Sequence, residues 1–278
     1  MSLPPEELDS ILTLAKQAAV RAGELLLETY GTLEGGGFRR KSNARDLVTE
    51  TDVASERLLV RFLREAFPGH SIEAEEEVRD EPDDGKPRWF IDPLDGTVNF
   101  VQGLPLFCVS LGLYVDGAPM VSVVHAPVLG ETFSARLGGG CTLESRTGSR
   151  ELHVSPKTEL SESILATGFP YRREVLRPSN LENFSGFFYG VRGLRRMGSA
   201  ALDLAYVAAG RLDGFWELYL SPHDVAGGAL LIREAGGVVT DSDGGEDWLR
   251  GGHIVASGPG IHGAILEGVA GPDPAWSA

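Results

Sequence analysis

Hydrophobic residues recur at three- and four-residue steps over residues 5–30 and again over 53–67, which predicts two amphipathic helices. Gly31 follows the first segment and Pro68-Gly69 follows the second, as expected at helix ends. The chain then changes to short runs of strand character at 88–91, 107–115, 119–125 and 131–136. Asp116-Gly117, between two of these runs, is a strong hairpin signal. Up to about residue 145, the pattern predicts two helices and an antiparallel sheet.

Beyond about residue 150 the predicted strands and helices alternate. Strands are expected at 163–167, 212–218, 238–240 and 254–257, and helices at 199–209, 224–235 and 261–268. This alternation is typical of an α/β layer. Glycine and proline are spread over many turns and form no linker, so we expect two closely packed domains, 1–148 and 149–278.

Charge and composition argue against several classes of protein. The chain of 278 residues has 25 Lys and Arg against 40 Asp and Glu, a formal net charge of −15. This balance argues against nucleic-acid binding and suits a protein that holds cations. Two cysteines are too few for a disulfide scaffold. No hydrophobic run approaches the roughly 18 residues of a membrane span, and the acidic N-terminus is unlike a signal peptide. We therefore expect a cytoplasmic protein without a membrane partner.

The strongest chemical signal is the segment Asp92-Pro93-Leu94-Asp95-Gly96-Thr97, which follows an apolar strand. A proline-containing turn here would bring both carboxylates to one side and expose the Leu94 carbonyl. Such a cluster of oxygen atoms suits Mg²⁺, and without a cation the two carboxylates would repel each other. Gly96-Thr97 then begins a predicted short helix, whose free N–H groups favour a phosphate. The alternative is an ordinary surface turn.

Four weaker signals each have a simpler explanation when taken alone. Asp52 and Asp224 lie at predicted helix starts, where either could act as a cap. Glu75 belongs to an acidic stretch, 73–84, of the kind that is usually a solvated loop. Gly198-Ser199, in the segment Arg196 to Asp203, is a plausible helix entry.

Together these segments resemble the inositol monophosphatase family of Mg²⁺-dependent, lithium-sensitive phosphatases, and bacterial members are the most similar. The resemblance extends from Lys41 to Gly237. Two signatures carry it: Asp-Pro-x-Asp-Gly-Thr-x-Asn-Phe at 92–100, and Asp224 with Glu-Ala-Gly-Gly beginning ten residues later. The resemblance implies an α/β fold, an αβαβα layered sandwich with an N-terminal antiparallel sheet and a C-terminal α/β sheet. Family members are commonly homodimers.

The resemblance also implies a role for each candidate residue. Two or three Mg²⁺ ions would be held by Glu75, Asp92, the Leu94 carbonyl, Asp95 and Asp224. The backbone N–H groups of Gly96 and Thr97 would bind the phosphate. Substrate contacts would come from Asp95, Ala200 and Glu217. The catalytic residues would be Glu75, Thr97 and Asp52, with Asp52 bonded to the Thr97 hydroxyl and the water oriented by them. Residues 1–148 would thus carry most metal and phosphate ligands, and residues 149–278 the substrate contacts and the last metal aspartate.

The implied reaction is hydrolysis of a small polyol phosphate, above all inositol 1-phosphate, by direct attack of a metal-activated water. The same scaffold serves fructose-1,6-bisphosphatases, histidinol-phosphatases and nucleotide 3′/2′-phosphatases. Nucleotide contacts could come from Tyr171, Arg172, Arg173 and Arg192. A non-catalytic regulatory protein is a further alternative, although every matched ligand position is present.

The roles of two further features are not fixed by the family resemblance. His223 stands where the family usually has Trp, beside the last metal aspartate. A side chain next to a ligand usually points elsewhere, although His223 could contact substrate or metal. The glycine-rich segment 33–38, with Lys41, is a candidate lid over the site.

Overall fold

The computed structural model describes residues 3–32, 38–40, 47–81 and 85–269. The two predicted N-terminal helices are α1 (Pro5–Thr29) and α2 (Glu50–Ala66). Helix α2 begins three residues before the predicted start at residue 53, because Thr49 caps it and forms a reciprocal capping box with Asp52. The same Asp52 is therefore both a helix-capping residue and a candidate site residue.

A seven-stranded sheet in the order β3-β4-β5-β6-β7-β8-β9 forms the first half. Its strands are β3 (Ser71–Ala74), β4 (Arg88–Asp95), β5 (Cys108–Val115), β6 (Ala118–Ala126), β7 (Glu131–Arg136), β8 (Cys141–Ser145) and β9 (Gly148–Glu151). Each neighbouring pair is antiparallel except β3 and β4, which run parallel. The predicted antiparallel sheet is thus confirmed from β4 onward, and the predicted hairpin at Asp116-Gly117 joins β5 to β6.

The predicted turn at Asp92-Pro93-Leu94-Asp95 was wrong. All four residues stay within β4, and the pairing with β5 shifts register between Asp92 and Asp95. Pro93 lacks a backbone N–H and is tolerated at such an irregularity. The short helix predicted next is α3 (Thr97–Val101).

A five-stranded sheet in the order β11-β10-β12-β14-β13 forms the second half. Its strands are β10 (Ile164–Thr167), β11 (Gly193–Arg195), β12 (Gly214–Leu218), β13 (Val238–Thr240) and β14 (His253–Ser257). Its helices are α4 (Leu181–Phe187), α5 (Ala200–Ala208), α6 (Pro222–Glu234) and α7 (His262–Gly268). Strand β10 is parallel to β11 and β12, whereas β14 is antiparallel to β12 and β13. Short elements complete the chain: β1 (Phe38–Arg40), β2 (Leu47–Thr49) and the 3₁₀ turn η1 (Leu160–Glu162).

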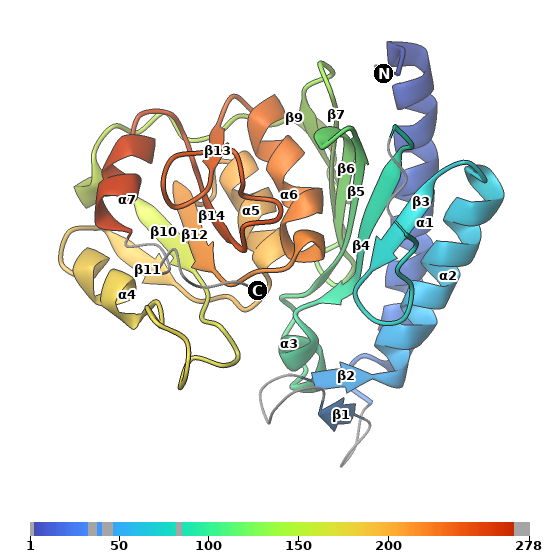
Figure 1. Cartoon of the computed structure of the whole chain (residues 1–278), viewed down its shortest axis with the longest axis horizontal. Coiled ribbons are helices and arrows are strands. Elements are labelled where there is room, and N and C mark those ends of the chain that lie inside the picture. The colour runs from blue at the N-terminus through green and yellow to red at the C-terminus, as the bar shows by residue number, and fades with distance from the viewer. Residues whose placement is uncertain (1–2, 33–37, 41–46, 82–84, 270–278) are drawn as a thin grey trace.

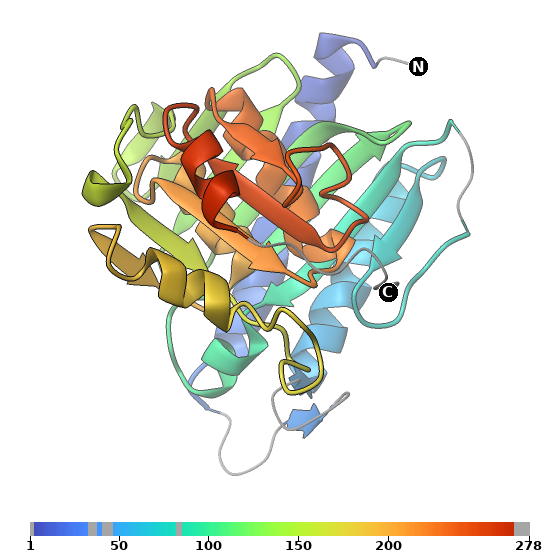
Figure 2. The same ribbon diagram turned by 60° about the vertical axis from the view of Figure 1, so that its left-hand side comes forward.

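The layers follow the order helices, sheet, helices, sheet, helices, which confirms the predicted αβαβα sandwich (Figure 1). Alternate residues of β4 face opposite layers: Trp89 and Ile91 pack with α1 and α2, whereas Phe90 packs with α5 and α6. Helices α4 and α7 cover the outer face of the second sheet (Figure 2). The predicted boundary at 148–149 falls inside β9, and the middle core draws on both halves. A division into two domains stays a prediction.

Within the described ranges, no helix is both long enough and apolar enough to cross a membrane. Residues 33–37 and Lys41 of the predicted lid lie outside the described residues. The lid therefore stays a prediction.

Candidate active site

A cavity of about 350 Å³ lies where strand β4 and the helices α3, α5 and α6 meet. Its wall contains every predicted site residue except Asp52: Glu75, Asp92, Leu94, Asp95, Gly96, Thr97, Ala200, Glu217 and Asp224. These residues come from both halves of the chain, so the cavity exists only when the two sheets and the helices between them are packed together.

Asp92 and Asp95 are buried, and hydrogen bonds hold one oxygen of each. Asp92 Oδ1 accepts from the Leu94 N–H at 3.0 Å. Asp95 Oδ2 accepts from the Ser199 hydroxyl and the Ala201 N–H, both at 2.7 Å. Because Ala201 lies in the first turn of α5, the Asp95 carboxylate also faces the positive end of that helix. Asp95 thereby joins the first sheet to the middle helices.

Thr97 is held from two sides. Its hydroxyl lies 3.0 Å from Asp52 Oδ1 and 3.2 Å from the Leu94 carbonyl oxygen. Asp52 Oδ2 accepts in turn from the backbone N–H of Thr49, at 2.9 Å, and from the Thr49 hydroxyl. Asp52 therefore lies behind Thr97, outside the cavity wall, and fixes the position of its hydroxyl.

Gly96 makes the sharp turn from β4 into α3. Its φ angle is +96°, and a Cβ here would lie 3.0 Å from the Leu106 carbonyl oxygen. Both observations require glycine, since only glycine adopts this conformation at little cost. Elsewhere in the cavity wall, Asp224 Oδ2 accepts from the Ser221 N–H at 2.6 Å and closes a capping box at the start of α6. The capping role that the sequence offers for Asp224 is thus present alongside its place in the cavity wall.

Burial makes this group of carboxylates hard to ionise. It raises the pKa of Asp52 to about 6, of Asp95 to about 7 and of Glu217 to about 8. The pKa of Asp92 is also raised, first by burial and then by its negative neighbours Glu75, Asp95 and Asp224. Carboxylates that oppose one another's ionisation are stabilised by a divalent cation.

The donor set therefore fits Mg²⁺, which prefers carboxylate and carbonyl oxygens. Among the residues that the structure describes, no three acidic, His or Cys side chains are already gathered around one point. The fit rests on the chemistry of the donors and on their shared cavity.

The sequence profile of the inositol monophosphatase family matches residues 7–271. The chain belongs to the inositol monophosphatase family. Nus factor SuhB of Pasteurella multocida is 40% identical over 260 residues, which cover 94% of this chain and 96% of that protein. An inositol-1-monophosphatase of Mesorhizobium japonicum is 39% identical over 263 residues, which cover 95% and 97%. The structure of inositol monophosphatase from Anabaena (Nostoc) sp. PCC 7120 matches with a TM-score of 0.84 and 40% identity, over 97% of this chain and all of that one. The resemblance seen in the sequence is confirmed, and it supports a phosphatase that acts on small phosphate esters.

Sequence reasoning missed Glu56, a buried carboxylate on α2. It accepts from three consecutive backbone N–H groups, those of Glu76, Glu77 and Val78, at 2.6, 2.8 and 2.9 Å. Glu56 thus fixes the loop that directly follows Glu75. The available signal was an acidic residue four positions after Asp52, on the buried face of a predicted helix.

Asp203 and Arg196 also lie in the cavity wall, although the sequence indicated only a helix entry there. Burial raises the pKa of Asp203 well above its ordinary value, and nearby Glu217 and Asp95 raise it further. In the described part of the chain, Asp203 Oδ1 has no hydrogen-bond partner. This inositol monophosphatase family member therefore has an acidic surface beside Glu217, with Arg196 as a nearby positive charge.

The position at which the family usually has tryptophan also lies in the cavity wall. His223, which replaces it, is buried and lines the cavity. Of the four residues considered for nucleotide binding, Tyr171 alone is among the described residues that line the cavity. The described wall thus contains Tyr171 but not Arg172, Arg173 or Arg192.

Proposed function

We propose that this chain is a Mg²⁺-dependent phosphomonoesterase that acts on a small polyol phosphate, with inositol 1-phosphate as its preferred substrate. One observation carries the proposal: residues from Glu75 to Asp224, matched to the family's metal, phosphate and substrate positions, line one cavity of about 350 Å³. Members of the family generally depend on a metal, typically Mg²⁺.

The cations would be held by Glu75, Asp92, Asp95, Asp224 and the Leu94 carbonyl, two or three ions in all. When bound, they supply positive charge to the phosphate oxygens and to the departing alcohol oxygen. The chain's own contribution is to orient these ligands. The hydrogen bonds to Asp92, Asp95 and Asp224 restrict how each carboxylate can turn.

The attacking water would be oriented by Thr97, Asp52 and Glu75. Asp52, with a pKa of about 6, is largely ionised at neutral pH and lies in hydrogen-bond contact with the Thr97 hydroxyl. As the water loses a proton to Thr97 Oγ1, the hydroxyl proton moves to Asp52 Oδ1. The backbone N–H groups of Gly96 and Thr97 would bind the phosphate oxygens.

The alcohol part of the substrate would contact Ala200 and Glu217. A carboxyl group with a pKa of about 8 can donate or accept a hydrogen bond from a polyol hydroxyl. The described wall carries more acidic than basic residues, with Arg79 and Arg196 as its positive charges. Because acidic groups repel a second phosphate, this wall favours a monophosphate over a bisphosphate or a dinucleotide.

The proposal is tested by measuring inorganic phosphate release from five compounds, each with Mg²⁺ and with EDTA. The panel is inositol 1-phosphate, fructose-1,6-bisphosphate, histidinol phosphate, NADP and 3′-phosphoadenosine 5′-phosphate. We expect Mg²⁺-dependent release, fastest from inositol 1-phosphate. Faster turnover of another compound would correct the substrate, and no release from any of them would overturn the proposal.

Asp95→Asn tests the site itself. Removing this charge should lower kcat about 100-fold or more while leaving the folded state intact by circular dichroism. Asp243→Asn, at an exposed position outside the cavity, is the matched control and should keep full activity. Near-normal turnover of Asp95→Asn would remove Asp95 from the metal site.

The relatives named Nus factor SuhB support a second candidate function, a regulatory role exerted by binding another molecule. It would be favoured if the chain bound Mg²⁺ but hydrolysed no ester of the panel. A cytoplasmic location and a homodimer also stay predictions. Light scattering on the purified chain gives the mass that decides between a monomer and a dimer.

A further inference from the structure

A second cavity, of about 290 Å³, lies at the opposite end of β3 and β4 from the candidate active site. Ser71 begins β3 and Arg88 begins β4, and both line this cavity. Asp95 ends β4, roughly 20 Å along the strand from Arg88 at about 3.3 Å per residue. The two cavities are therefore separate.

Strand register explains why the lining residues share one face. Ser71 pairs with Arg88, and Arg88 pairs with Tyr114 on β5. Phe90 lies two residues beyond Arg88 and so points to the same side of the sheet. The loop before β14 adds Arg250, whose guanidinium carbon lies 5.1 Å from the centre of the Phe90 ring. The cavity thus forms where the loop before β14 meets the edge of the first sheet.

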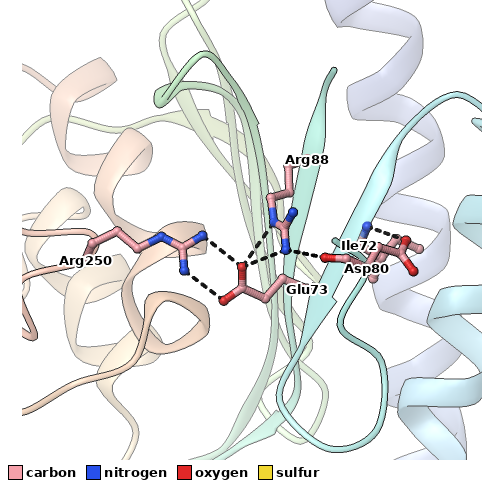
Figure 3. A network of polar contacts seen from close by, with 5 residues as sticks. All are labelled: Ile72, Glu73, Asp80, Arg88 and Arg250. Atoms are coloured by element: carbon pink, nitrogen blue, oxygen red, sulfur yellow. Dashed lines mark hydrogen bonds and ion pairs between the residues drawn. The ribbon is translucent and has the colours of Figure 1, made fainter. Parts of the chain in front are cut away.

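The charges at this cavity are unusual for a chain with a net charge of −15. Arg88 and Arg250 both pair with the single carboxylate of Glu73, at 3.0 and 2.8 Å (Figure 3). Burial alone would raise the pKa of Glu73, but the two arginines lower it. Lys86 and Asp116 also line the cavity and offset each other in charge. Two guanidinium groups that share one carboxylate leave an excess of positive charge.

Two buried donors at this cavity lack an acceptor. Among the described residues, neither Arg88 Nη1 nor the Ser71 hydroxyl has a hydrogen-bond partner. Ser71 is 8% exposed, and the remaining Arg88 donors bond to Glu73 and to the Asp80 carbonyl oxygen. A buried donor without a partner costs free energy, which a ligand with acceptor oxygens would recover.

We propose that this cavity binds a small oxyanion of the phosphate class. Its oxygens accept from the Ser71 hydroxyl, from Arg88 Nη1 and from Arg250, whose side chain is about half exposed and reachable from solvent. The three donors belong to β3, to β4 and to the loop before β14, so they approach the cavity from different directions. That arrangement suits a tetrahedral oxyanion better than a planar carboxylate.

The test is calorimetric titration of the full chain with inorganic phosphate in the presence of EDTA. Without a cation, the carboxylates of the candidate active site repel phosphate, so saturable binding reports on the second cavity. Ser71→Ala and Arg250→Gln should each weaken phosphate binding about tenfold. Arg61→Gln, an exposed arginine on α2, removes the same charge elsewhere and should leave the affinity unchanged.

Thermal unfolding of Ser71→Ala should match that of the unmodified chain, because the hydroxyl has no partner to lose. A parallel titration with phenyl phosphate shows whether the site takes free phosphate or a phosphoryl group on a larger molecule, and binding of either compound supports the site. The proposal is overturned by the absence of saturable binding or by unchanged affinity in Ser71→Ala and Arg250→Gln. Tighter binding of acetate than of phosphate would equally overturn it.

Discussion

Buried Glu56 can control the candidate active site without touching a substrate. Its carboxylate is the common acceptor for three backbone N–H groups in the loop after Glu75. A backbone segment held by one ionic acceptor keeps a single conformation, and the neighbouring Glu75 side chain is positioned by that conformation. Glu56 is therefore a positioning residue, comparable to Asp52 behind Thr97.

Glu56→Ala should lower both stability and metal affinity. The change leaves three partly buried N–H groups without their acceptor, which we expect to cost about 3 kcal/mol of unfolding free energy. Because the loop would no longer hold Glu75 in position, the Mg²⁺ concentration needed for half-maximal phosphate release should also rise about tenfold. Urea unfolding and a Mg²⁺ titration of activity measure the two effects. If Glu56→Ala is destabilised but keeps its Mg²⁺ dependence, the role of Glu56 is structural only.

Gly168→Ala tests Glu217 through its neighbour. A Cβ on Gly168 would overlap the Glu217 carboxylate, which can turn away because it is the end of a flexible side chain. We therefore expect little change in stability but about a tenfold higher KM for inositol 1-phosphate. The KM for p-nitrophenyl phosphate, which has no polyol hydroxyl groups, should stay the same. An equal change for both substrates would contradict a specific contact between Glu217 and the polyol.

The sequence predicts the cavity residues that belong to motifs but not those that support them. The segment at 92–97 has an informative order of residues, whereas Glu56 is one acidic residue among several on its helix. Asp203 likewise resembles any acidic residue near a helix start. Their roles depend on burial and on partners distant in the chain, and neither property is visible in local spacing.

At the level of elements, the packing of α6 depends on a run of small residues. A Cβ at Gly227 would overlap the Ser110 hydroxyl on β5, and one at Gly228 would lie 2.5 Å from Leu204 Cβ on α5. The small residues Gly227 and Gly228 thus allow α6 to lie close to both β5 and α5. Since Asp224 lies in the first turn of the same helix, this packing also sets the position of a candidate metal ligand.

Gly227→Ala should push α6 away from β5. We expect this displacement to lower both the stability of the chain and its activity. We expect a loss of about 1–3 kcal/mol from overpacking, and a Tm lowered by about 2–4 °C for each kcal/mol. Gly263→Ala is the matched control, because a Cβ on that residue of α7 meets nothing within 4 Å. Thermal unfolding of the two variants compares the same chemical change at a crowded and an open position. Equal Tm values would rule out close packing at Gly227.

Helices and strands with a clear local pattern of hydrophobic residues were predicted well. Elements that depend on pairing with other parts of the chain were not. The sequence predicts α1, β7 and β13 almost to the residue. Strand β3 was missed because it runs into the acidic stretch that begins at Glu73, and exposed β9 has no apolar pattern. The segment 92–95 continues as strand because β5 pairs with it on both sides of the irregularity, and that pairing is non-local.

At the level of the whole molecule, packing the two halves together gathers negative charge. Asp95 from the first sheet, Glu217 from the second and Asp224 from the middle helices are brought to one cavity. The raised pKa values of Asp95 and Glu217 show that this arrangement opposes their ionisation. Folding without a cation is therefore less favourable at a pH where these groups must lose their protons.

The stability of the metal-free chain should consequently fall between pH 7 and 8.5. In this window, folded Asp95 and Glu217, with pKa values of about 7 and 8, hold protons that the unfolded chain has already lost. Stability decreases with pH wherever the folded state binds more protons, here by about 1–2 kcal/mol in total. Three histidines whose pKa values are lowered by desolvation have the opposite effect but titrate below about pH 6.5: His70, His125 and His262.

Thermal unfolding in EDTA at pH 7.0, 7.75 and 8.5 measures this slope. Glu217→Gln should flatten it and raise the Tm at pH 8.5, whereas Glu267→Gln, at an exposed position on α7, should leave it unchanged. Mg²⁺ should raise the Tm more at pH 8.5 than at pH 6, because cation and proton compete for the same carboxylates. A Tm that is independent of pH in EDTA would mean that the carboxylates ionise freely in the folded chain. A rise with Mg²⁺ that is equal at both pH values would mean that the ion binds outside this cavity.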